Sequence, residues 1–152
     1  MSANFDEILQ KVYQYSKPIA FGLVILGTLL VDLTIGAILP FWITPLTLGI
    51  IAGILIGSAQ AGLYAILGAM LGRLMSILVM VLAVPGLLET LELFISAIGD
   101  FIGVTLPGGS LIIIILSMLI SGIFAGLGGT TGGSIVQLFK NYTAYKQKTT
   151  AN

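Results

Sequence analysis

The chain contains no cysteine and no histidine, and only 8% of its 152 residues are charged. The absence of these two residue types excludes zinc or haem ligation through them, thiol redox chemistry, disulfides and catalytic triads. Six basic and six acidic residues balance to zero net charge. A nucleic-acid partner is therefore not expected, because that binding depends on excess lysine and arginine. We expect no catalytic residue, no metal site and no cofactor.

Apolar residues and glycine make up most of what remains. Hydrophobic residues reach 57%, there are 20 glycines, and the mean hydropathy is +1.14. A soluble domain carries roughly 25% charged residues and needs a polar surface to cover its core. We therefore predict an all-α, polytopic protein of the cell membrane: a helical bundle with four transmembrane helices and additional amphipathic interfacial helices.

Four apolar stretches approach the length of about 20 residues that a helix needs to cross a bilayer. They are residues 18–39, residues 45–57, residues 61–84, and a stretch from Leu111 to at least Gly128. Pro18 suits the opening turn of the first span, and Ser110 suits the N-cap of the fourth. The second stretch is short, so we expect local bilayer thinning or a slightly buried turn beside it.

Three other segments have apolar residues at helical spacing, which is typical of helices at a membrane surface. The chain therefore divides into an amphipathic N-terminal helix over 1–17, a four-helix transmembrane domain over 18–139, and a polar tail over 140–152. The transmembrane domain includes an interfacial segment at 86–104. Lysines flank the first and fourth spans, whereas the connection between the third and fourth has none. We thus expect both termini in the cytoplasm.

Small residues recur at every fourth position in three of the expected spans. In lipid, where hydrophobic burial cannot drive helix association, small residues permit close helix contact. We predict such contact, within the chain or with a second subunit, at seven glycines: Gly49, Gly53, Gly57, Gly68, Gly72, Gly122 and Gly126. Residues 126–134 indicate either close helix contact or a hinge before the C-terminal segment. Residues 51–57 resemble residues 120–126, which indicates either duplicated hairpins whose second and fourth spans run parallel or a chance similarity between two helices rich in isoleucine and glycine.

The glycine spacing of the second and third spans, together with the glycine-rich run at 128–133, resembles a family of small archaeal four-helix membrane proteins. The resemblance covers most of the chain and implies the four-helix fold. It implies no activity, because none is assigned to that family. The four-helix proteolipids of rotary ATPases are similar in outline only: they need a carboxylate inside a span, normally the last, and residues 111–139 contain no acidic residue.

Two charged residues, Asp32 and Arg73, fall inside expected spans. Each costs roughly 2.5–3.5 kcal/mol at the bilayer centre unless it has a partner or water. Counted from the expected starts of their helices, both lie at a depth of about 20 Å. We therefore predict that they pair. The pair is interpreted either as a clamp between the first and third spans or as part of an ion or proton path; alternatively, one or both side chains reach the outer interface.

A weaker pattern is an acidic ridge on the interfacial segment, formed by Glu89, Glu92 and Asp100. It indicates a solvated helix face or, alternatively, a vestibule that gathers cations.

The sequence as a whole favours a non-enzymatic bundle with a structural or accessory role, in contact with lipid and with further copies of itself or other membrane proteins. The alternative is a small-ion channel or transporter that uses Asp32 and Arg73.

Overall fold

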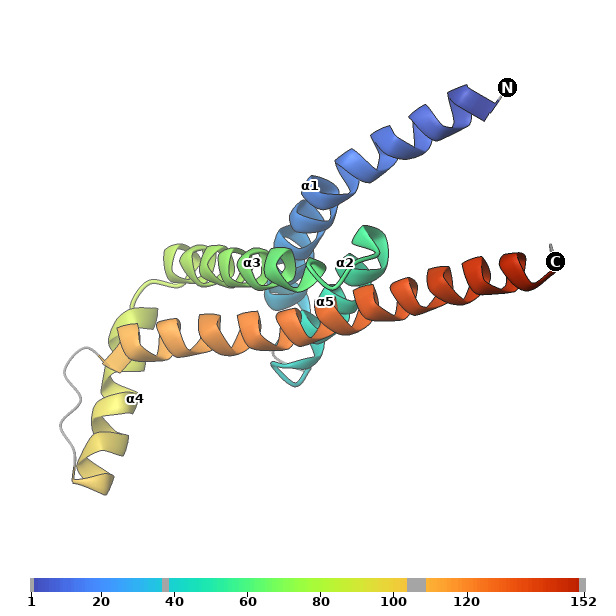
Figure 1. Cartoon of the computed structure of the whole chain (residues 1–152). Helices are drawn as coiled ribbons and strands as arrows, with labels where there is room; N and C mark the ends of the chain where they lie inside the picture. Colours follow the sequence, from blue (N-terminus) through green and yellow to red (C-terminus); the bar gives the residue numbers. More distant parts are fainter. Residues whose placement is uncertain (1, 37–38, 104–108, 151–152) are drawn as a thin grey trace.

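The computed structural model describes residues 2–36, 39–103 and 109–150, with side chains described for 15–36, 39–101, 103 and 109–146. This part of the chain is helical. Its five helices are α1 (Ser2–Thr34), α2 (Ile43–Ile56), α3 (Ala61–Ala83), α4 (Leu87–Ile102) and α5 (Gly109–Thr150). Figure 1 shows α1, α2, α3 and α5 in one bundle, with α4 across one end and both termini toward the other.

The length and apolar character of three helices suffice to cross a membrane. They are Tyr15–Thr34 within α1, Ala61–Ala83, and Gly109–Lys146 within α5. The helix α2 has 14 residues, about 21 Å at 1.5 Å per residue, which is short of the roughly 30 Å of a hydrocarbon core. Three of the expected spans therefore have the required length, and the second expected span, residues 45–57, corresponds to the short helix α2.

Two long helices extend further than the sequence suggests. The helix α1 continues through Pro18, whereas we expected a helix to open there. A proline inside a helix removes one hydrogen bond but does not force an end. The side chains that would form the apolar face of 1–17 lie mostly outside the described ones. At the other end, α5 reaches Thr150, so most of the expected polar tail is helical, and Ser110 lies inside the first turn of α5 and not at an N-cap.

Close approaches at glycines give the direction of each helix pair. Gly68 lies against Val24 and Gly72 against Thr28, so α1 and α3 run parallel. Gly49 lies against Ala125, and further along both helices Gly53 lies against Gly129, so α2 and α5 also run parallel, as the repeat predicts for the second and fourth spans. The core consists mainly of small side chains, because six of the eight buried residues in the main apolar cluster are alanines.

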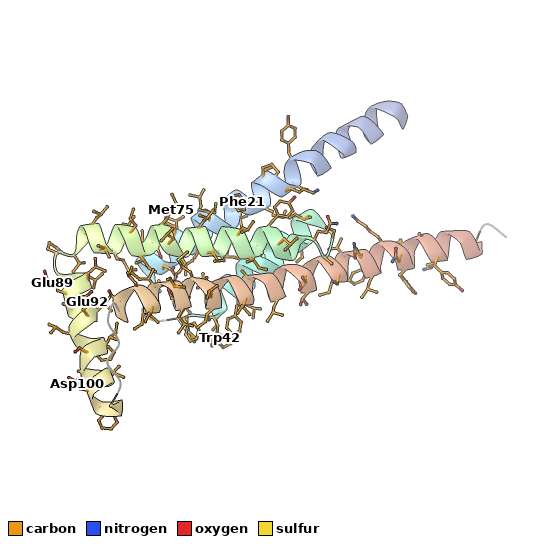
Figure 2. All side chains as sticks on the ribbon, turned by 60° about the vertical axis from the view of Figure 1, so that its left-hand side comes forward. Phe21, Trp42, Met75, Glu89, Glu92 and Asp100 are labelled. Carbon is orange, nitrogen blue, oxygen red and sulfur yellow. The ribbon has the colours of Figure 1, made fainter. Side chains whose placement is uncertain are left out.

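The turn between α1 and α2 lies beside the middle of α5. The Trp42 ring centroid is 6.2 Å from that of Phe124, and Phe41 meets the same ring edge-on at 6.4 Å. Figure 2 shows Trp42 on the opposite side of the bundle from Phe21 and Met75. Because α2 starts here, it runs beside only the later part of α5, and the first ten or so residues of α5 have no α2 next to them.

The helix α4 lies across the end of the bundle that is opposite to the termini (Figure 1). Its buried anchor is Ile95, 5% exposed, which lies against Gly109 at the start of α5. Leu87 and Leu91 are half-buried, whereas Leu93, Phe94 and Phe101 are between 62% and 91% exposed. The predicted interfacial segment is therefore a separate helix that leaves most of its apolar surface uncovered by the bundle.

Candidate functional site

The predicted intramembrane pair is present within the chain. Arg73 Nη1 lies 2.6 Å from Asp32 Oδ2, and the Asp32 side chain is 6% exposed. The Ser76 hydroxyl lies 3.0 Å from the same carboxylate oxygen, to which it can donate, and 2.9 Å from the Arg73 carbonyl as an alternative acceptor. The site thus joins a carboxylate on α1 to a guanidinium and a hydroxyl on α3.

Glycines on α3 allow this short contact. A Cβ at Gly72 would lie 2.8 Å from the Ile25 carbonyl oxygen and 2.9 Å from Thr28 Cβ, and one at Gly68 would lie 3.0 Å from Val24 Cβ. Any side chain at either position would push α1 away from α3. Since the two helices run parallel from the same side, Asp32 and Arg73 reach the same depth. Gly68 and Gly72 therefore position the ion pair.

Not all polar atoms around the pair are satisfied. Among the described side chains, Arg73 Nε and Thr28 Oγ1 are buried without a hydrogen-bond partner. Thr28 is 1% exposed and lies one turn before Asp32 on α1. A guanidinium has five N–H donors, more than one carboxylate can accept. The site consequently retains donor capacity beyond its internal ion pair.

A cavity of about 550 Å³ lies next to the pair. Its walls come from the end of α1, the second half of α3, the first turns of α4 and the first turns of α5, which is the region of α5 that α2 does not reach. Arg73, Asp32, Ser76, Ser117 and Thr34 contribute polar side chains. No pattern in the sequence predicts this cavity, because the cavity depends on where α2 begins.

The predicted glycine contacts occur within the chain. Gly49 and Gly53 on α2 meet the α5 backbone, and Gly122 and Gly126 on α5 meet Met70 and Ile66 of α3. Gly57 has a φ of 65° and ends α2, with Lys140 Nζ 3.2 Å from where its Cβ would be. A lysine ammonium at a helix C-terminus is favourable.

Further glycines lie at the same seams. Gly128, Gly129, Gly132 and Gly133 on α5 belong to the run 126–134, for which close helix contact is one of the two predictions, whereas Gly62 on α3 was not predicted. They place α5 against the backbones of both α2 and α3. The run at 126–134 is thus a site of close helix contact inside an unbroken helix, and the hinge interpretation is wrong. The signal was present in the sequence, as glycine at two adjacent rows of one helix.

The three residues of the predicted acidic ridge lie on α4. Glu89, Glu92 and Asp100 are all exposed, and Figure 2 shows them spread along α4 at the end of the bundle. Glu92 Oε1 lies 3.2 Å from Ser110 Oγ, so it accepts a hydrogen bond from the first turn of α5. Among the described residues, no group of three potential ligands is close enough to hold a metal ion.

The Ser76 hydroxyl has a measurable role in this site. Replacing Ser76 with alanine is expected to lower the free energy of unfolding by about 1.5 kcal/mol, because a hydrogen bond to a charged carboxylate is lost. The measurement is a reversible unfolding titration in mixed micelles. The matched control is Ser117→Ala, since Ser117 Oγ donates its hydrogen bond to the Ile114 carbonyl of its own helix. Equal losses for both variants would contradict a special role for Ser76.

Comparison of the chain with protein-family models, with curated proteins and with solved structures finds no match. The resemblance to small archaeal four-helix membrane proteins therefore stays a prediction, and the functional proposals below depend on the geometry and charge of the chain itself.

Proposed function

We propose that the chain is an integral membrane protein with a structural or accessory role and no catalytic activity. The observation that best supports this proposal is that the two charged residues of the expected spans form an ion pair with each other. Asp32 and Arg73 contact each other at 2.6 Å and join α1 to α3. A charge pair held this closely stabilises a helix arrangement, whereas a permeation path for hydrophilic solutes normally has many lining polar groups.

The proposed topology has four membrane segments, with α2 as the short one and α4 at the interface. A short helix can be accommodated by local thinning of the bilayer. Lysines occur before the first span and along the last part of α5, and α4 carries acidic but no basic residues. By the positive-inside rule, this distribution favours cytoplasmic termini and an outer position for α4.

The proposal includes association with further copies of the chain or with other membrane proteins. The glycine contacts are made inside the bundle, so association would use the exposed side chains of the spans. These are predominantly large and apolar, such as Leu67 and Leu78 on α3 and Leu116 on α5, each between 52% and 59% exposed. Crosslinking in native membranes is expected to give one discrete product above the monomer. A monomer alone, at crosslinker doses that trap known complexes, would contradict this part of the proposal.

A second candidate function is transport of a small ion, and the cavity of about 550 Å³ beside Asp32 and Arg73 favours it. In this function the pair would open transiently and carry or repel the ion. Asp32 would be the group that binds a cation or a proton, and Arg73 would be its competing partner.

Flux through liposomes separates the two functions. For a structural role, we expect purified protein in liposomes to conduct protons and potassium no faster than protein-free liposomes. The measurement uses a pH-sensitive dye and a potassium-sensitive dye in the lumen. A protein-dependent flux that Asp32→Asn abolishes, and that Glu89→Gln on exposed α4 leaves intact, would contradict the structural role and support transport.

A further inference from the structure

The cavity beside the ion pair has two chemically different parts. Its polar side chains belong to Asp32, Arg73, Ser76, Thr34 and Ser117. The remaining lining side chains are apolar and come from three helices: Ile77 and Met80 of α3, Leu87 and Leu91 of α4, and Ile113 and Ile114 of α5, together with Leu33 at the end of α1. A site of this kind suits a molecule with one polar end and an apolar body.

The polar end of the cavity includes a hydrogen-bond donor group, the Arg73 guanidinium, that its internal partners do not saturate. Arg73 Nε is buried without a partner among the described residues, and Asp32 Oδ2 already accepts from Arg73 Nη1, with the Ser76 hydroxyl 3.0 Å away as a further donor. The Arg73 side chain keeps 23% of its surface exposed and is one of the lining residues. A ligand with a hydrogen-bond acceptor therefore suits the guanidinium at this end.

The charge of the site selects between possible acceptors. Asp32 and Arg73 together are neutral, so an anionic head group would bring an uncompensated negative charge into a low-dielectric region next to a carboxylate. Such a charge is costly to bury. A neutral oxygen, as in a ketone, an ester or an ether, accepts the hydrogen bond without that cost. The apolar walls exclude a ligand that is polar along its whole length.

We propose that this cavity is a binding site for a neutral, lipid-like molecule with a hydrogen-bond-accepting oxygen at one end. The oxygen lies at the guanidinium of Arg73, and the apolar body lies along Ile77, Met80 and Ile114. The volume of about 550 Å³ is within the 300–1,000 Å³ that is typical of small-molecule sites. The site exists because α2 begins part-way along α5, and α4 covers the space that remains. It does not depend on whether the protein transports ions.

Photolabelling of the intact protein in lipid nanodiscs tests the proposal. The probe is an alkyl ketone with a diazirine in its chain, and labelled peptides are located by mass spectrometry. Labels are expected on the cavity-lining parts of α3, α4 and α5. Methyl nonyl ketone is expected to displace the probe about tenfold better than undecane at equal mole fraction in the lipid, because only the ketone accepts a hydrogen bond from a charged donor. Decanoate, which adds a negative charge, is expected to compete less well than the ketone.

Two adjacent residues of α3 provide a matched pair of variants. Ile77 lines the cavity, whereas its neighbour Leu78 does not line it and is 59% exposed. Ile77→Trp is expected to remove labelling by filling the cavity, and Leu78→Trp to leave it unchanged. In the double variant Asp32→Asn/Arg73→Gln, labelling is expected to persist without the preference for the ketone, since the guanidinium is gone.

Three outcomes of the labelling and competition experiments would contradict the proposal. If undecane competes as well as the ketone, the cavity holds an ordinary acyl chain. If decanoate competes best, the site recognises an anion. Labelling spread evenly over the exposed faces of α3 and α5, and insensitive to Ile77→Trp, would show that the cavity is not a binding site. Each of these results overturns the proposal.

Discussion

Replacing Gly53 with valine is expected to destabilise the bundle by about 3 kcal/mol or more, or to prevent its assembly. A Cβ at this position would lie 2.7 Å from the Gly133 amide nitrogen and 3.0 Å from Gly132 Cα, and it would also meet the Gly129 carbonyl oxygen. All three contacts are with the backbone of α5. Backbone atoms cannot rotate aside as a flexible side chain can, so the seam between α2 and α5 must open along its length.

The matched control is the same substitution on α1. Gly22 is also a helix-interior glycine, but nothing lies within 4 Å of its Cβ position. Valine and glycine differ little in intrinsic helix propensity, so Gly22→Val is expected to change stability by less than about 0.5 kcal/mol. The measurement is unfolding in mixed micelles, with helix content followed by circular dichroism. If Gly53→Val and Gly22→Val behave alike, α2 and α5 are not in contact at this seam.

Breaking the ion pair at one side is expected to cost about 3–5 kcal/mol, since the remaining charge stays buried without its partner. Asp32→Asn leaves Arg73 without its carboxylate, and Arg73→Gln leaves the Asp32 carboxylate, 6% exposed, without its guanidinium. The double variant removes both charges and is expected to recover part of the loss. Its total destabilisation should therefore be smaller than the sum of the two single losses.

This double-mutant cycle is read from unfolding in mixed micelles, with each variant checked for helix content. Glu89→Gln serves as the control for removing a charge, because Glu89 is exposed on α4. It should leave stability within about 0.5 kcal/mol of the parent protein. Additive losses in Asp32→Asn and Arg73→Gln would mean that the two residues act independently, and the clamp between α1 and α3 would be refuted.

Sequence reasoning reached the ion pair by a simple route. A charge inside an apolar helix is costly, and the only two such charges in the expected spans are of opposite sign. Equal depth along two helices that start from the same side then brings Asp32 and Arg73 together. The same reasoning did not predict that Ser76 contacts Asp32, although Ser76 is also buried. A serine in a membrane helix can donate its hydrogen bond to a backbone carbonyl of its own helix and then needs no other partner. The contact between Ser76 and Asp32 depends on the rotation of α3.

Helix boundaries were the weaker part of the sequence reading. The sequence predicts a helix start at Pro18 and offers a hinge at 126–134 as one of two interpretations, yet α1 continues through Pro18 and α5 continues through 126–134. Tertiary contacts explain the second case. A glycine-rich helix has low intrinsic stability, but Gly129 and Gly133 allow α5 to lie against α2 and α3 on two sides. The contacts that glycine permits outweigh its low helix propensity.

Composition alone predicts membrane-spanning helices in this chain, because a helix surrounded by lipid needs no polar surface and is therefore apolar along its whole length. The periodicity of small residues further shows which helix faces approach another backbone. Neither the composition nor this periodicity identifies the partner helix, because a glycine can lie against the backbone of any neighbouring helix. The folded chain settles that question: it uses the glycine rows internally, it starts α2 too late to cover the beginning of α5, and it thereby leaves the cavity at Asp32 and Arg73. These features depend on the lengths and rotations of neighbouring helices, which no single segment encodes.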